Sequence, residues 1–177
     1  MIRYCFFEYG NIFKSCELAL FSTAPIVAAR EKIKLIFYGE NVSLQYGYDN
    51  QVSKDGNANN LKNNSTLAGG DIGQYLMNGF KKNKLFWYDY PDEKTFISNK
   101  LRMIFLGYYI PDFNDKKNSS FAIRKGLKVR DGFDADPINT GTITNYDCLD
   151  DDFVYVNQMI KFFKFGMGKV AEQTSAF

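Results

Sequence analysis

Two short apolar runs, each followed by a glycine, are the clearest pattern in this sequence. Residues 33–38 (IKLIFY) end at Gly39, and residues 101–106 (LRMIFL) end at Gly107. Runs of this length that are rich in Ile, Phe and Tyr are typical of strands buried on both faces of a parallel sheet. The sequence therefore predicts an α/β fold in which a parallel sheet is flanked by helices.

Helical spacing of apolar residues, supported by capping and proline signals, predicts the helices. They cover residues 11–20, 23–32, 71–80, 91–100, 116–125 and a stretch from Phe153 to the glycine at 166. The last helix carries an apolar stripe that we expect to be buried (Phe153, Val156, Ile160 and Phe163). Another face carries a polar stripe (Asn157, Lys161 and Lys164), for which a solvated surface is the simplest interpretation.

Polar and aromatic residues follow both predicted strands. Open α/β sheets bind ligands outside the carboxyl ends of their strands, and Gly39, Glu40 and Asn41 stand at such an end. Gly39 permits close backbone approach, while a carboxylate and an amide can hold a metal ion, a sugar hydroxyl or a proton. Tyr108 and Tyr109 follow the second strand. An ordinary turn explains glycine and asparagine at this place equally well.

Residues 48–70 are rich in asparagine and almost free of apolar periodicity. A stretch of this kind predicts a flexible loop, either a functional lid or a disordered insertion. Gly69 and Gly70 close it and precede Asp71, a suitable N-cap for the helix predicted next. The glycine pair gives only a weak signal for phosphate binding, because the pattern of a phosphate loop is missing.

Composition restricts the chemistry further. A net charge of +2 without a Lys/Arg cluster argues against a nucleic-acid partner. The sequence has no histidine, so any catalysis relies on carboxylates, lysines, tyrosines, cysteines, backbone amides or a bound metal ion. The 3 cysteines form no CxxC pattern and are expected to be reduced thiols of a cytoplasmic protein. No stretch approaches the roughly 20 apolar residues that a membrane span needs.

Three segments of the chain carry a resemblance to a known family. They are residues 38–48 (YGENVSLQYGY), 105–113 (FLGYYIPDF) and 159–175 (MIKFFKFGMGKVAEQTS). These segments resemble the N-acetyl sugar amidotransferase family, a group of PP-loop ATP-pyrophosphatases of surface-polysaccharide (lipopolysaccharide, O-antigen) biosynthesis. The resemblance implies a Rossmann-like adenine-nucleotide α-hydrolase fold, of which residues 1–177 form the later part. The family's cysteine pairs and its Ser-Gly-Gly-Lys-Asp-Ser phosphate loop are not in this sequence, so we expect the chain to be a fragment.

The same resemblance implies the reaction. ATP adenylylates the oxygen of a sugar acetamido group, and ammonia from a glutaminase partner then displaces AMP to leave an acetamidino group. It implies catalytic roles for Glu40 and Asn41, with Glu40 as a ligand of Mg²⁺. The implied substrate-binding residues, for a nucleotide-linked N-acetyl sugar, are Tyr46, Gly47, Tyr108 and Tyr109. The implied phosphate-binding residues, for ATP, are Gly39, Lys161, Lys164 and Gly166.

A different class of function competes with this one. A non-catalytic nucleotide-sugar binding or interaction domain derived from the same fold would carry the same motifs. An intact upstream reading frame that carries the phosphate loop would favour the enzyme, and a genuine start at Met1 would favour the binding domain.

Overall fold

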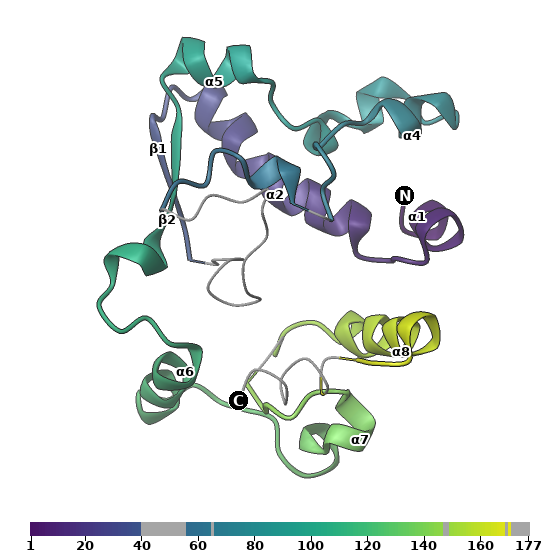
Figure 1. Cartoon of the computed structure of the whole chain (residues 1–177), viewed down its shortest axis with the longest axis vertical. Helices are drawn as coiled ribbons and strands as arrows, with labels where there is room; N and C mark the ends of the chain where they lie inside the picture. Colours follow the sequence, from purple (N-terminus) through teal and green to yellow (C-terminus); the bar gives the residue numbers. More distant parts are fainter. Residues whose placement is uncertain (40–55, 65, 147–148, 169, 171–177) are drawn as a thin grey trace. The chain divides into compact units, whose positions relative to one another are not determined.

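The computed structural model describes residues 1–39, 56–64, 66–146, 149–168 and 170. Within these ranges the protein is a mixed α/β structure, mostly helical, with a two-stranded parallel sheet packed against helices (Figure 1). Two compact units are present. One contains 14–113, and the other contains 3–13 with 114–177. A single domain over residues 1–177 stays a prediction.

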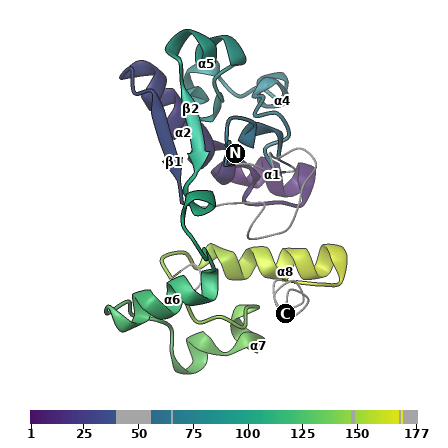
Figure 2. The same ribbon diagram turned by 60° about the vertical axis from the view of Figure 1, so that its left-hand side comes forward.

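The sheet consists of β1 (Leu35–Tyr38) and β2 (Arg102–Phe105), which run parallel. Leu35 lies opposite Arg102 and Tyr38 lies opposite Phe105, so both strands end at the same level. Figure 2 shows them side by side. Both strand predictions and the parallel arrangement are therefore confirmed.

One face of this sheet is covered and the other is not. Tyr38, Met103 and Phe105 are buried, whereas the side chains of Leu35 and Phe37 are 42% and 57% exposed. Alternate residues of a strand point to opposite faces, so the exposed pair shares the face away from the core. The prediction that the first strand is buried on both faces is wrong, because within the described ranges the helix packed on β1 covers the Tyr38 face alone.

A single long helix, α2 (Lys14–Arg30), runs obliquely to the strands, and its later part lies beside β1 (Figure 1). The prediction of two helices, the second beginning near Pro25, is wrong because Pro25 lies inside α2. Proline has no N–H for the carbonyl four residues earlier, which belongs to Phe21. The Tyr38 hydroxyl donates to that carbonyl oxygen at 3.4 Å, so a strand residue takes the place of the missing helical donor.

Shorter elements complete the unit of residues 14–113. They are the 3₁₀ helices η1 (Leu61–Asn63), η2 (Lys82–Lys84), η3 (Phe86–Tyr88) and η4 (Leu106–Tyr109), with α4 (Gly73–Met77) and α5 (Glu93–Asn99). The Asp92 carboxylate caps α5 by accepting from the Thr95 N–H at 2.9 Å. The helix predicted over 71–80 is shorter, and its N-cap is Ile72, because the Asp71 carboxylate accepts from the Gly73 N–H in a tight turn instead.

The other unit is helical in the part that the structure describes. Its elements are α1 (Ile2–Tyr9), α6 (Asp115–Arg124), the 3₁₀ helix η5 (Gly132–Ala135), α7 (Pro137–Thr140) and α8 (Phe153–Phe165). The sequence prediction missed α1, whose C-cap is Gly10 in the left-handed conformation at φ 57°. The predictions of α6 and α8 are confirmed, with Asn114 capping α6 and Gly166 ending α8 at φ 70°.

The buried face of α8 differs from the predicted one. Val154 and Gln158 are buried, whereas Phe153, Val156 and Phe163 of the predicted stripe are 49%, 47% and 82% exposed. The Gln158 Cβ lies 3.0 Å from the position that a Cβ on Gly141 would occupy. The turn after α7 therefore packs against Gln158 on the buried face of α8.

Candidate functional site

The carboxyl edge of the sheet is the candidate site that sequence reasoning and the structure share. Gly39 directly follows β1, and η4, which contains Tyr108 and Tyr109, directly follows β2. Because the two strands are in register, Gly39 and the start of η4 lie at the same edge. Gly39 is exposed, and no described atom lies within 4 Å of the position its Cβ would occupy.

The two tyrosines differ in their surroundings. Tyr108 is half-buried, while the Tyr109 side chain is 62% exposed. A Cβ on Gly56 would lie 2.7 Å from the Tyr109 ring and 3.1 Å from its hydroxyl oxygen. The close approach of Gly56 supports one side of the Tyr109 ring. An exposed tyrosine held in this way can stack on a sugar or a base and can donate or accept a hydrogen bond.

Gly107 has a packing role. It is buried, and a Cβ there would lie 3.1 Å from the Phe113 ring. The glycine after β2 thus lets Phe113 pack closely on the chain. The two glycines that end the apolar runs therefore differ: Gly39 has free space around it, whereas Gly107 is packed against an aromatic ring.

Asp112 is a candidate at the same segment that the sequence reasoning did not single out. It adopts a left-handed φ of 57° and is exposed, three residues after Tyr109. Aspartate is one of the few residues that tolerates this conformation, and such outliers concentrate at functional sites. The Pro-Asp pair at 111–112 was the available sequence signal.

Several predicted site residues lie outside the described ranges. They are Glu40, Asn41, Tyr46 and Gly47, and the Mg²⁺ site predicted at Glu40 lies outside with them. Among the residues that the structure describes, no group of three Cys, Asp or Glu side chains could hold a metal ion. The roles of Glu40, Asn41, Tyr46 and Gly47 in catalysis, substrate binding and metal binding stay predictions.

The predicted phosphate-binding residues of α8 belong to the unit of residues 3–13 and 114–177. The Lys164 ammonium donates to the backbone carbonyl of Tyr9 at 2.6 Å and lies 5.1 Å from the Phe165 ring centroid. That carbonyl is at the carboxyl end of α1, where a helix concentrates partial negative charge. Lys164 therefore already has a structural role, and its binding of phosphate stays a prediction.

Lys161 is half-buried, and Gly166 is exposed and left-handed. An open depression of about 440 Å³ lies between α1 and α8, lined by Phe6, Tyr9, Gly10, Ile160, Phe163 and Lys164. Its lining is mainly apolar and aromatic, so it does not provide the cluster of donors that a phosphate requires.

Burial changes the acidity of two tyrosines. Burial, together with a hydrogen bond to Tyr4, raises the pKa of Tyr9 to about 12. Burial also raises the pKa of Tyr90, whose hydroxyl lies 3.7 Å from the Met103 sulfur beneath the sheet. Both phenols therefore stay protonated to a higher pH than an ordinary tyrosine does.

No protein-family model matches the chain, and no curated protein matches it either. No helix in the described ranges is long and apolar enough to cross a membrane. The geometry at the sheet edge and the sequence motifs are thus the basis for a functional proposal.

Proposed function

We propose that this chain belongs to an ATP-dependent amidotransferase that converts the acetamido group of a nucleotide-linked sugar into an acetamidino group. The observation that carries the proposal is the pair of in-register parallel strands whose carboxyl ends lead to Gly39 and to Tyr108-Tyr109. Parallel strands bind ligands at this edge. Both ends coincide with motifs that resemble the N-acetyl sugar amidotransferase family, and the Rossmann-like PP-loop fold is part of the same proposal.

The proposed reaction has two steps, adenylylation of the amide oxygen and then displacement of AMP by ammonia. The acetamido oxygen forms a bond to the α-phosphorus of ATP, and the bond from that phosphorus to the bridging oxygen breaks to release pyrophosphate. Ammonia then forms a bond to the imidate carbon, the carbon–oxygen bond breaks, and AMP leaves with a proton released from nitrogen. Mg²⁺ supplies charge neutralisation on the phosphates. Neither step needs a histidine as a base, which agrees with the absence of histidine from the sequence.

In this proposal the residues of the sheet edge position the sugar. Gly39 gives room for close approach, and the exposed ring of Tyr109 stacks on the sugar or the base. Glu40 and Asn41 orient the acetamido group, and a glutaminase partner supplies ammonia.

Calorimetric titration of the chain with a uridine-diphosphate N-acetyl sugar tests the proposal. Loss of stacking costs about 1–3 kcal/mol, so we expect Tyr109→Ala to weaken binding by about tenfold or more. Glu40→Gln should weaken it similarly, because one charge-assisted hydrogen bond is lost. Phe86→Ala, at a 49% exposed aromatic residue of η3 in the same unit as Tyr109, is the matched control and should leave affinity unchanged.

Uridine diphosphate without the sugar should bind more weakly than the complete nucleotide sugar. Absence of saturable binding, or equal affinity in wild type, Tyr109→Ala and Glu40→Gln, would contradict the proposal. Sugar-dependent binding to a chain that never turns over ATP, even beside its partner proteins, would support the alternative of a non-catalytic binding domain.

A further inference from the structure

An exposed apolar face runs along α8, the yellow helix in Figure 2. Val156, Met159 and Phe163 recur on it at helical spacing, and their side chains are 47%, 60% and 82% exposed. Phe162, beside them, is 59% exposed. The two lysines of α8 belong to the polar stripe on another face, so the apolar face carries no charge within the helix. The sequence pattern predicts burial here, and the described residues leave the face exposed.

The size of this face suits an interface between proteins. A whole aromatic side chain has roughly 200 Å² of surface, so the exposed parts of Phe153, Phe162 and Phe163 together provide about 400 Å². Val156 and Met159 add to this area. An interface of standard size takes about 800 Å² from each partner, and somewhat more than half of it is non-polar. The face therefore supplies most of the non-polar area that one partner needs.

Charges near the two ends of α8 indicate the partner. Asp150 and Asp152 are exposed just before its first residue. Lys161 and Lys164 lie in its second half. Asp152 stands four residues before Val156, so it continues the row of the apolar face. A membrane with anionic lipids would attract the lysine end of this helix but repel the aspartate end.

A second copy of the same helix meets the charges at both ends. When two α8 helices pack antiparallel, the aspartate end of each lies beside the lysine end of the other. The helix dipoles then also lie with opposite ends adjacent, which is favourable. The Lys164 ammonium has three N–H donors and gives one of them to the Tyr9 carbonyl, so it can also donate to Asp152 of a second copy.

We propose that two copies of this chain associate through α8, packed antiparallel about a two-fold axis near Met159. Met159 is the middle residue of the helix (Phe153–Phe165), so each copy offers the same surface to the other. The aromatic second half of each helix, with Phe162 and Phe163, covers Val156 of the other. The inference does not rest on the proposed amidotransferase function.

Sedimentation equilibrium of the intact chain tests this inference, and we expect a reversible dimer at micromolar concentrations. Met159→Glu brings two carboxylates together at the two-fold axis and should weaken the dimer by about a hundredfold. Because Met159 is exposed in the single chain, this variant should keep its helix content in circular dichroism. Phe133→Glu, at a 76% exposed aromatic residue of η5 in the same unit, is the matched control and should leave the dimer intact.

Asp152→Lys tests the orientation of the two helices. The Asp152 side chain makes no capping hydrogen bond to α8, so its replacement should leave the helix in place. In the antiparallel dimer this change turns two attractive contacts into repulsive ones and should weaken association by about tenfold. A parallel pair would place like residues opposite each other, and the same change would not weaken it.

Three results would overturn the inference: a monomer at every concentration, a dimer that Met159→Glu leaves intact, and an unchanged dimer affinity of Asp152→Lys. Sedimentation of the chain with phosphatidylserine vesicles examines the other occupant. A monomer that binds these vesicles, and loses this binding in Met159→Glu, would assign the face to a membrane surface instead.

Discussion

At the scale of single residues, the contact between Tyr38 and α2 explains how a proline is accommodated in a long helix. Pro25 removes the N–H that would bind the Phe21 carbonyl, and the Tyr38 hydroxyl donates to that oxygen at 3.4 Å. A buried carbonyl without a donor is costly, so this tertiary hydrogen bond compensates for a local defect. It also connects the helix to the last residue of β1, directly before the candidate site at Gly39.

The contact predicts a coupling between two substitutions. Tyr38→Phe keeps the ring but loses the donor, and should lower the free energy of unfolding by about 0.5–1.5 kcal/mol. In a Pro25→Ala background the alanine N–H can bind the Phe21 carbonyl, so the same Tyr38→Phe change should cost close to nothing. Urea denaturation of the four proteins measures the coupling, with Tyr109→Phe as a control at an exposed hydroxyl. Equal costs of Tyr38→Phe in both backgrounds would refute this role.

At the scale of elements, a lysine hydrogen bond connects α8 to the carboxyl end of α1. Lys164 of α8 donates to the carbonyl of Tyr9 at the end of α1, and the rings of Tyr4 and Tyr9 meet edge to face at 6.1 Å. The carboxyl end of a helix favours a cation, so Lys164 stabilises α1 as well as the contact between the two helices.

The acidity of Tyr9 makes this element pair sensitive to alkali. Its pKa is raised to about 12 in the folded protein by burial and by the Tyr4 hydrogen bond, against about 10 for an unfolded tyrosine. As the pH rises, the unfolded chain releases this proton first. The contribution to stability is therefore complete below about pH 10 and is lost as the pH rises to about 12.

We expect Tyr9→Phe to remove this part of the pH dependence. The difference in unfolding free energy between wild type and Tyr9→Phe, measured from pH 9 to pH 12 in about half-unit steps, cancels the titration of the other tyrosines. Wild type should lose stability relative to the variant above about pH 10. Parallel curves over the whole range would show that Tyr9 titrates normally.

At the scale of the whole molecule, the proposed reaction needs a phosphate loop that this sequence does not contain. Phosphoryl transfer depends on backbone amides, a lysine and Mg²⁺ that neutralise the phosphates, and the 177-residue sequence has no Ser-Gly-Gly-Lys-Asp-Ser segment. We predict no pyrophosphate release by the chain when ATP, Mg²⁺, ammonium chloride and a nucleotide-linked N-acetyl sugar are supplied. Release above a no-protein control, abolished by Glu40→Ala, would contradict this prediction.

Local signals in the sequence determined the secondary structure where neighbours along the chain suffice. The apolar runs ended by glycine gave β1 and β2, and the glycine at 166 gave the end of α8. Each of these signals acts within one turn or one strand, because caps and glycine conformations depend on adjacent backbone groups.

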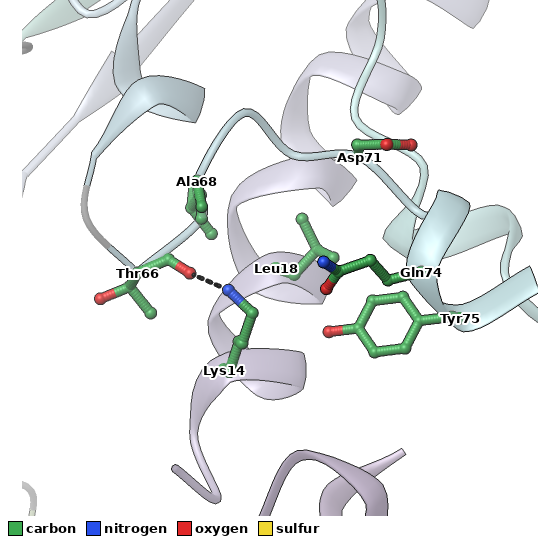
Figure 3. Close-up of a pocket in the computed structure, with 8 residues that line it drawn as sticks. Lys14, Leu18, Thr66, Ala68, Asp71, Gln74 and Tyr75 are labelled. Carbon is green, nitrogen blue, oxygen red and sulfur yellow. Dashed lines mark hydrogen bonds between the residues drawn. The ribbon is translucent and has the colours of Figure 1, made fainter. Parts of the chain in front are cut away.

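Tertiary structure alone decided which faces are covered and which side chains meet. The exposed face of β1, the continuity of α2 through Pro25 and the buried face of α8 each depend on a partner distant in sequence. The same holds for two lysine hydrogen bonds: Lys14 donates to the Thr66 carbonyl, 52 positions away (Figure 3), and Lys164 donates to the Tyr9 carbonyl, 155 positions away. A periodic pattern shows that one face of a helix or strand is apolar. Whether that face is buried depends on a second surface that packs against it, and this surface comes from a distant part of the chain when the protein folds.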